Sequence, residues 1–291
     1  MTVQAPERTA AAPGSGGPAV LTLRDAALAY GARTLWDGLD LDVAPGEFVA
    51  VLGPNGAGKT SLLRTVLGQQ RLTNGTMSFL GQPVRRGHRR IGYIPQQRLM
   101  EAGTPLRARD MVTQGVTGHR WGVRPVSRAD RARVDRILDE VGATGFADAP
   151  VAELSGGEQQ RTRVGQAIAA DPALLLCDEP LISLDLRHQR GVTELIDRQR
   201  RQQGAAVLFV THDVNPILDV VDRVLYIAGG RFRIGAPDDV LRTDVLSDLY
   251  GTPVDVVRTM GRIVIVGANE AAHDHHCDPD PHAPTPDGGR I

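Results

Sequence analysis

A buried strand that runs straight into a glycine-rich loop constrains this fold more than any other feature. Five consecutive apolar residues, Phe48 to Leu52, lead into the loop. An unbroken apolar run is typical of a strand buried on both faces of a parallel sheet. After the loop, Leu62, Leu63 and Val66 recur at helical spacing. The order strand, glycine loop and helix predicts a phosphate loop on an α/β fold.

The loop contains the residue types that binding a nucleotide phosphate requires. Glycines let the backbone N–H groups surround a β-phosphate, and the following helix directs its positive end there. We expect Lys59 to reach the β- and γ-phosphates and Thr60 to bind Mg²⁺. A chance glycine turn is the alternative, which the flanking strand and helix disfavour. The predicted ATP-binding residues of this segment are Gly53, Pro54, Asn55, Gly56, Ala57, Gly58, Lys59, Thr60 and Ser61.

Two adjacent carboxylates follow another apolar run. Asp178 and Glu179 come directly after Leu174 to Cys177, at the end of a predicted buried strand, where open α/β sheets bind ligands. Asp178 would then complete the Mg²⁺ site, and Glu179 would orient or deprotonate the attacking water. Alone, the pair could equally be the acidic start of the next helix; beside a phosphate loop, catalysis is the better interpretation.

A serine, two glycines and a glutamate form a helix start with two possible uses. Ser155 and Glu158 are spaced as a capping box, which would begin an ordinary helix. Two bare glycines at such a start leave N–H groups open to a γ-phosphate. Both interpretations can hold together.

These motifs, with Ser183-Leu184-Asp185 and Thr211-His212-Asp213 after them, occur in a fixed order. From about residue 19 to residue 250 the chain therefore resembles the ATP-binding-cassette (ABC) ATPases. The resemblance implies an α/β fold with a phosphate-loop core, an antiparallel β subdomain and an inserted helical subdomain. It departs from the common pattern at Leu184, where the family usually has alanine after the serine, and we expect little consequence.

The resemblance also implies roles that the residues alone do not establish. Two copies would bind head to tail, with two ATP molecules between them. His212 would contact the γ-phosphate, and Gln96 or its neighbour Gln97 would sense Mg²⁺ and a membrane partner. Tyr30 would stack on adenine, unless it is a core aromatic at a strand end. The residues that would reach the ATP of the second copy are Leu154, Ser155, Gly156, Gly157, Glu158 and Asp185.

Changes in composition divide the chain into segments. Residues 1–18 are rich in Ala, Pro, Gly and Ser, and we expect a disordered lead-in without a secretory signal. An ATPase domain would span 19–250, with a helical insertion over 98–157 that contains a capping box at Ser127. A strand extension over 251–267 and a histidine-rich flexible tail over 268–291 would complete the chain.

Composition narrows the functional classes. The formal net charge is −1, which does not indicate nucleic-acid binding. The two cysteines, Cys177 and Cys277, suggest a reducing compartment. The longest apolar runs fall well short of the roughly 20 residues that a membrane helix needs. An integral membrane permease would have to be a separate chain, with this one at the cytoplasmic face of the membrane.

The cargo is indicated by weaker signals. The sequences of residues 91–100, 110–118 and 178–186 resemble those of the zinc, manganese and iron branch of bacterial importers. In that branch, extracytoplasmic binding proteins deliver the ion. The tail is either an incidental polar segment or a metal-binding one, since imidazole and thiolate suit Zn²⁺. Its candidate ligands are His273, His275, His276, Cys277 and His282.

Three alternatives to a metal importer stay open at this point. The first is an importer of a siderophore or other small solute, and the second is a non-transport ABC ATPase. The third is a metal-binding regulator in which the tail is primary and ATP secondary. A second cassette or a basic surface would mark the non-transport class, and neither is visible in the sequence.

Overall fold

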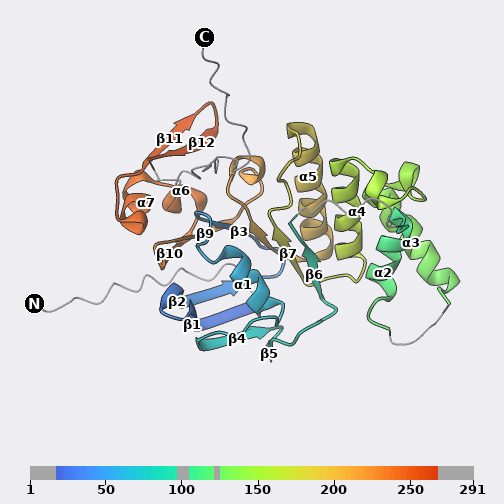
Figure 1. Cartoon of the computed structure of the whole chain (residues 1–291), viewed down its shortest axis with the longest axis horizontal. Coiled ribbons are helices and arrows are strands. Elements are labelled where there is room, and N and C mark those ends of the chain that lie inside the picture. The colour runs from blue at the N-terminus through green and yellow to red at the C-terminus, as the bar shows by residue number, and fades with distance from the viewer. Residues whose placement is uncertain (1–17, 97–104, 121–124, 268–291) are drawn as a thin grey trace, which may run out of the picture.

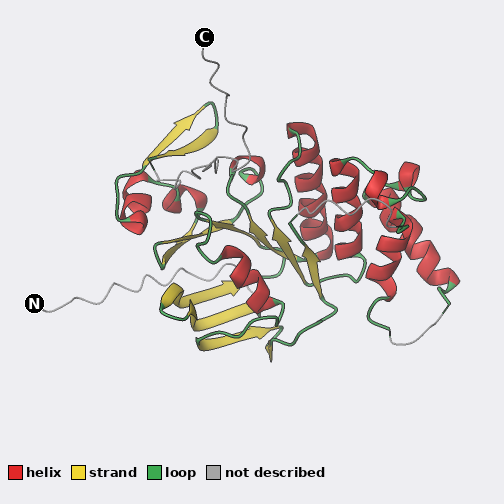
Figure 2. Cartoon of the chain, viewed as in Figure 1, coloured by secondary structure: helices red, strands yellow, loops and turns green. Residues whose placement is uncertain are grey.

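The computed structural model describes residues 18–96, 105–120 and 125–267. A central sheet separates an antiparallel sheet on one side from a group of helices on the other (Figures 1 and 2). The expected lead-in, apart from Pro18, the histidine-rich tail and Gln97 lie outside the described residues. No helix in the described ranges is long and apolar enough to cross a bilayer.

The central sheet has six strands in the order β10-β9-β3-β8-β7-β6. Five of them are parallel, and β10 closes one edge as the antiparallel partner of β9. The strands are β3 (Phe48–Leu52), β6 (Ile91–Ile94), β7 (Leu174–Asp178), β8 (Ala206–Val210), β9 (Arg223–Ala228) and β10 (Arg231–Gly235).

Strand β3 explains why its sequence is apolar throughout. Phe48, Ala50 and Leu52 face one hydrophobic core, and Val49 and Val51 face the other. Alternate side chains of a strand point to opposite faces, so a strand between two cores needs apolar residues at every position.

The second layer is a four-stranded antiparallel sheet in the order β2-β1-β4-β5. It packs with helix α1 (Lys59–Val66) against the central sheet through a core that includes Leu21, Trp36 and Leu62. The pairing of β1 with β2 shifts register three times, which bends this sheet. Its strands are β1 (Leu21–Tyr30), β2 (Arg33–Val43), β4 (Asn74–Phe79) and β5 (Gln82–Pro83).

The third layer is helical. Helices α2 (Ala108–Thr117), α3 (Arg128–Glu140) and α4 (Gly156–Ile168) connect β6 to its parallel neighbour β7, with short 3₁₀ turns at Thr144–Phe146 and Val151–Glu153. Helix α5 (Leu186–Gln203) connects β7 to β8. Helices α2 and α3 fall inside 98–157, the range that we propose for the helical subdomain.

The C-terminal part extends the fold beyond β10. A 3₁₀ turn over Asn215–Ile217 precedes β9, and helices α6 (Pro237–Val240) and α7 (Thr243–Tyr250) follow β10. Strands β11 (Asp255–Thr259) and β12 (Arg262–Val266) then form a separate hairpin.

The apolar runs predicted these elements well, whereas polar strands were missed. The two buried strands predicted from apolar runs correspond to β3 and β7, and the helix predicted after the glycine loop corresponds to α1. Helix α5 begins directly after Asp185, which is its N-cap. Strand β4 was not predicted, because only Met77 and Phe79 in it are apolar and its pairing with β1 defines it.

Candidate functional site

The phosphate loop needs glycine for steric reasons. Gly53 follows β3 with φ +138°, and a Cβ there would lie 2.0 Å from the carbonyl oxygen of Ile227. Gly58, the N-cap of α1, has φ +100°, and its Cβ would lie 3.0 Å from Leu35. Both the left-handed backbone and the close neighbours exclude a side chain. The loop is therefore held tightly between β9 and β2 and leaves its backbone open to a ligand.

Lys59 lies inside the loop. Its Nζ donates hydrogen bonds to the carbonyl oxygens of Gly53 at 2.7 Å and Pro54 at 3.0 Å. Burial lowers the pKa of this ammonium group, while Glu179 and Asp178 act in the opposite direction. The amine is thus positioned by the loop, with two carboxylates at the end of β7 as its charge partners.

The carboxylate of Asp178 is held from two sides. Thr60 Oγ1 donates to its Oδ1 at 3.0 Å, and the Tyr93 hydroxyl donates to its Oδ2 at 3.3 Å. Asp178 is almost fully buried. The structure thus joins the first residues of α1 to the end of β7, two segments that lie 118 positions apart.

Glu179 has an unusual backbone and a single side-chain partner among the described residues. Its φ is +47°, in the left-handed region, and its N–H donates to the carbonyl oxygen of Val210 on β8 at 3.0 Å. Gln96 Nε2 donates to its Oε2 at 3.2 Å. A non-glycine residue held at positive φ is strained, and such strain gathers at functional sites. Gln96, at the end of β6, is therefore in contact with the predicted catalytic carboxylate.

Tyr30 lies beside the loop and not in the core. It ends β1, is 51% exposed, and its hydroxyl donates to Gln70 Oε1 at 2.7 Å. The Ser61 hydroxyl lies 3.4 Å from the Tyr30 hydroxyl oxygen. This exposure does not fit the alternative of a core aromatic at a strand end.

His212 follows β8 on the same edge of the sheet. His212 is exposed, whereas Val210, two positions earlier, is fully buried and pairs with Asp178. Because β7 and β8 are parallel, their carboxyl ends meet at one edge. The loops that carry Glu179 and His212 are therefore neighbours.

The capping box at the start of α4 is formed as the sequence predicts. The Glu158 N–H donates to Ser155 Oγ at 3.4 Å, and the Ser155 N–H donates to Glu158 Oε2 at 2.9 Å. The hydrogen bonds from Ser155 also lower the pKa of the Glu158 carboxyl. The Ser155 hydroxyl therefore has a hydrogen-bond partner within its own helix. It belongs to the start of α4 and not to the strand ends that carry the phosphate loop.

His188 is a residue of this region that sequence reasoning missed. A Cβ on Gly157 would lie 2.3 Å from His188 Cδ2, so the imidazole packs directly on this glycine. The His188 Nδ1 is 2.8 Å from Asp185 Oδ2, and the His188 N–H donates to Asp185 Oδ1 at 2.9 Å. The ring therefore joins the start of α4 to the N-cap of α5. Its position three residues after Asp185 was the available signal, because N-cap carboxylates bond to that residue.

Tyr93 is a second residue that sequence reasoning missed. Sequence alternation in Ile91–Ile94 shows a strand but does not show which residue faces Asp178. The pairing of Tyr93 with Leu176 on β7 brings its hydroxyl to that carboxylate.

The fold and this strand-end site define a phosphate-loop nucleotide-binding protein. A family model described as ABC transporter matches residues 36–182. The chain is 34% identical over 233 residues to a zinc import ATP-binding protein of Pseudomonas putida, with 80% of this chain and 84% of that protein covered. It is 34% identical over 252 residues to a hemin import ATP-binding protein of Rhodococcus jostii, with 84% of each chain covered.

A solved structure agrees. An inward-facing putative metal-chelate type ABC transporter superimposes with a TM-score of 0.72 at 26% identity, over 85% of this chain and 96% of that chain. The chain therefore belongs to the ABC transporter family, as an ATP-binding and ATP-hydrolysing member.

Proposed function

We propose that this chain is the ATPase subunit that drives import of a divalent metal ion, zinc, manganese or iron, through a separate membrane permease. The observation that carries the ATPase part is the contact between Gln96 and Glu179 beside the Thr60–Asp178 pair. These side chains come from three different segments, the end of β6, the start of α1 and the end of β7, and meet at one edge of the sheet.

The residues at this edge fit Mg²⁺ bound with ATP. The hydroxyl of Thr60 and the carboxylate of Asp178 are oxygen donors of the type that Mg²⁺ prefers, and Gln96 adds an amide oxygen. Bound there, Mg²⁺ would neutralise charge on the β- and γ-phosphates. Lys59 and the loop N–H groups would hold the phosphates in place.

Glu179 is the proposed base or water-orienting group. Its carboxylate is exposed enough to meet a water, and its backbone is fixed by the hydrogen bond to β8. That water would attack the γ-phosphorus in line as ADP leaves. His212, from the neighbouring loop, would contact the γ-phosphate, and Tyr30 would stack on adenine.

A second copy would complete each site. Residues 154–158 begin α4, and their glycine N–H groups suit a phosphate. Asp185 would join them through His188. We propose that they contact ATP on the phosphate loop of the partner copy, in a head-to-tail dimer.

The metal cargo is supported by the names of the relatives. One is a zinc importer's ATP-binding protein, and the solved structure belongs to a putative metal-chelate transporter. The hemin relative favours the second candidate, import of an iron chelate or other small solute. The permease would hold the chain at the cytoplasmic face of the membrane, and an extracytoplasmic binding protein would deliver the cargo.

The first test is a substitution at the catalytic carboxylate. Glu179→Gln should lower ATP turnover by about 100-fold or more, because the amide cannot take a proton from water. ATP binding should persist, and gel filtration should show ATP-bound dimers accumulating. Wild-type hydrolysis by this variant would contradict the assignment.

The cargo is tested in cells. The same variant at the native locus should selectively lower one of zinc, manganese or iron in metal-limited cells, measured by elemental analysis. A fall in iron that is accompanied by lost uptake of an iron chelate, or no change in any of the three metals, would favour the second candidate.

A further inference from the structure

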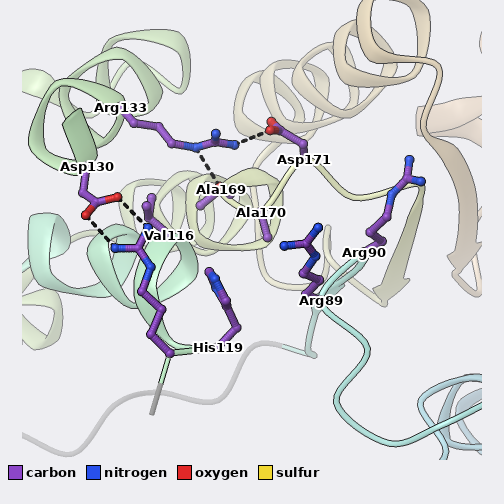
Figure 3. Close-up of a pocket in the computed structure, with 10 residues that line it drawn as sticks. Arg89, Arg90, Val116, His119, Asp130, Arg133, Ala169, Ala170 and Asp171 are labelled. Carbon is purple, nitrogen blue, oxygen red and sulfur yellow. Dashed lines mark hydrogen bonds and ion pairs between the residues drawn. The ribbon is translucent and has the colours of Figure 1, made fainter. Parts of the chain in front are cut away.

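A hollow lies away from the ATP site, where the helical layer meets the central sheet. It has a volume of about 440 Å³. The ends of α2 and α4, the first turns of α3 and the residues just before β6 line it (Figure 3). Strand β6 begins beside this hollow and ends towards Gln96, so the two sites are at opposite ends of one strand.

Two arginines of the hollow already have acidic partners. Arg120 makes two hydrogen bonds to the Asp130 carboxylate, at 2.7 and 2.8 Å. Arg133 pairs with Asp171 at 2.5 Å and donates to the carbonyl oxygen of Ala169 at 3.0 Å. Arg120 holds the pKa of Asp130 far below its usual range, so this pair is charged at neutral pH. Within each pair the arginine and the aspartate compensate each other's charge, and both pairs form part of the wall of the hollow.

Four arginines close to these pairs have no acidic partner among the described residues. Arg85, Arg86, Arg89 and Arg90 occur within six residues that contain no acidic residue. All four are exposed, and none of their guanidinium groups makes a hydrogen bond or ion pair with any other described residue. Arg89 and Arg90 line the hollow with His119, and the Arg89 side chain and the His119 ring extend into it (Figure 3). Since the whole chain has a net charge of −1, composition does not explain this local excess.

We propose that this hollow binds an anion that carries a phosphate group. Guanidinium groups match phosphate oxygens with paired hydrogen bonds, and two neighbouring arginines repel each other until a counter-anion arrives. The volume lies within the range of small-molecule sites, roughly 300–1,000 Å³. The hollow is compact and bounded by helix ends, which suits a small head group better than an extended acidic peptide.

The bound group would join two layers of the fold. Arg89 and Arg90 directly precede β6, whereas His119 and Arg120 follow the end of α2 and Arg133 lies in α3. An anion between them would fix the helices against the strand that leads to Gln96. Its source is either a free phosphate ester or the head group of an anionic lipid, because both present the same chemistry.

Two binding measurements on the full chain distinguish the sources. The phosphate loop is first saturated with a non-hydrolysable ATP analogue. Glycerol 3-phosphate is then titrated calorimetrically, and cosedimentation is measured with phosphatidylglycerol vesicles and with phosphatidylcholine vesicles. Arg89→Gln/Arg90→Gln is the test variant. Arg198→Gln is the matched control, because Arg198 is an exposed arginine on α5 whose side chain makes no hydrogen bond or ion pair with another described residue.

We expect the double variant to lose about tenfold or more in affinity for one probe, the amount expected for one charge-assisted bond, while the control binds normally. Loss with glycerol 3-phosphate assigns a free ester, and loss only with phosphatidylglycerol assigns a lipid. If the double variant melts early, Arg89→Gln alone gives the same comparison.

Three results would overturn the proposal. The first is no binding of either probe, and the second is an equal loss in the double variant and the control. The third is tight binding of a glutamate-rich peptide while both phosphate probes fail. ATP hydrolysis by the same proteins, measured without the analogue, reports on the ATPase assignment separately, so the two hypotheses can fail independently.

Discussion

Single side chains in this molecule are held by partners from distant segments. Asp178 is held by Thr60 and Tyr93, and Glu179 by Gln96 and the backbone of β8. His188 has the same kind of role at the other motif, because it packs on Gly157 and bonds to Asp185. Residues of this kind position a reacting group, and small displacements there are costly.

Removing the His188 ring should therefore lower turnover more than ATP binding. His188→Ala deletes the bond to Asp185 and opens space beside Gly157. We expect kcat for ATP hydrolysis to fall by about fivefold or more, with ATP affinity of the monomer within about twofold of wild type. Steady-state kinetics and nucleotide titration measure the two quantities.

The control for this substitution is Glu194→Ala, an exposed change on the same helix. An unchanged kcat in His188→Ala would show that the imidazole only fills space. An equal loss in both variants would point to general weakening of α5.

At the scale of secondary structure, two helices begin with the same capping box and serve different purposes. Ser127 accepts from the Asp130 N–H at 3.1 Å in α3, and Ser155 accepts from the Glu158 N–H at 3.4 Å in α4. Comparing the two caps distinguishes an effect on stability from an effect on catalysis, because only the α4 cap lies in a proposed ATP contact.

Serine-to-alanine changes at these caps should give similar losses of stability. Each should lower the free energy of unfolding by about 1 kcal/mol, as lost N-caps usually do. Only Ser155→Ala should also lower ATP hydrolysis. Chemical denaturation and an ATPase assay measure both effects, and equal hydrolysis in the two variants would contradict the proposed partner contact.

The middle of β7 should be chemically inert although it ends in catalytic residues. Cys177 is fully buried, and burial raises the pKa of its thiol, so the thiolate is absent across the pH range of ordinary assays. In a Cys277→Ser chain, a thiol reagent at pH 8 should react only after unfolding. Rapid labelling of the native variant would show that β7 opens locally.

For the whole molecule, the ATPase unit and the histidine-rich tail should be separable. The central sheet, both of its cores and the phosphate loop with Asp178 and Glu179 lie within the described residues. Deleting residues 271–291 should therefore leave hydrolysis within about twofold of wild type and alter only the response to metal, since polar tails add little to a packed core.

The measurement compares ATPase rate and cellular metal content in the deleted and full-length chains across a zinc series. Identical metal responses would reduce the tail to an incidental segment. Lost hydrolysis would favour the alternative in which the tail is primary.

The sequence by itself determined the elements with strong local signals. The apolar run into Gly53 specified a buried strand and phosphate loop, and the spacing of Ser155 and Glu158 specified a helix start. These are short-range effects of hydrophobic periodicity, steric freedom and capping, which operate within a few residues. The family resemblance followed from the same motifs.

Only the tertiary structure decided which side chains meet. The contacts of Gln96 with Glu179, of Tyr93 with Asp178 and of His188 with Gly157 depend on strand order and register, or on how two helix starts pack. The same is true of the arginine hollow, whose walls come from four segments that are separate in the chain. Such contacts arise from packing between distant segments, and the spacing of residues along the sequence does not indicate which segments pack together.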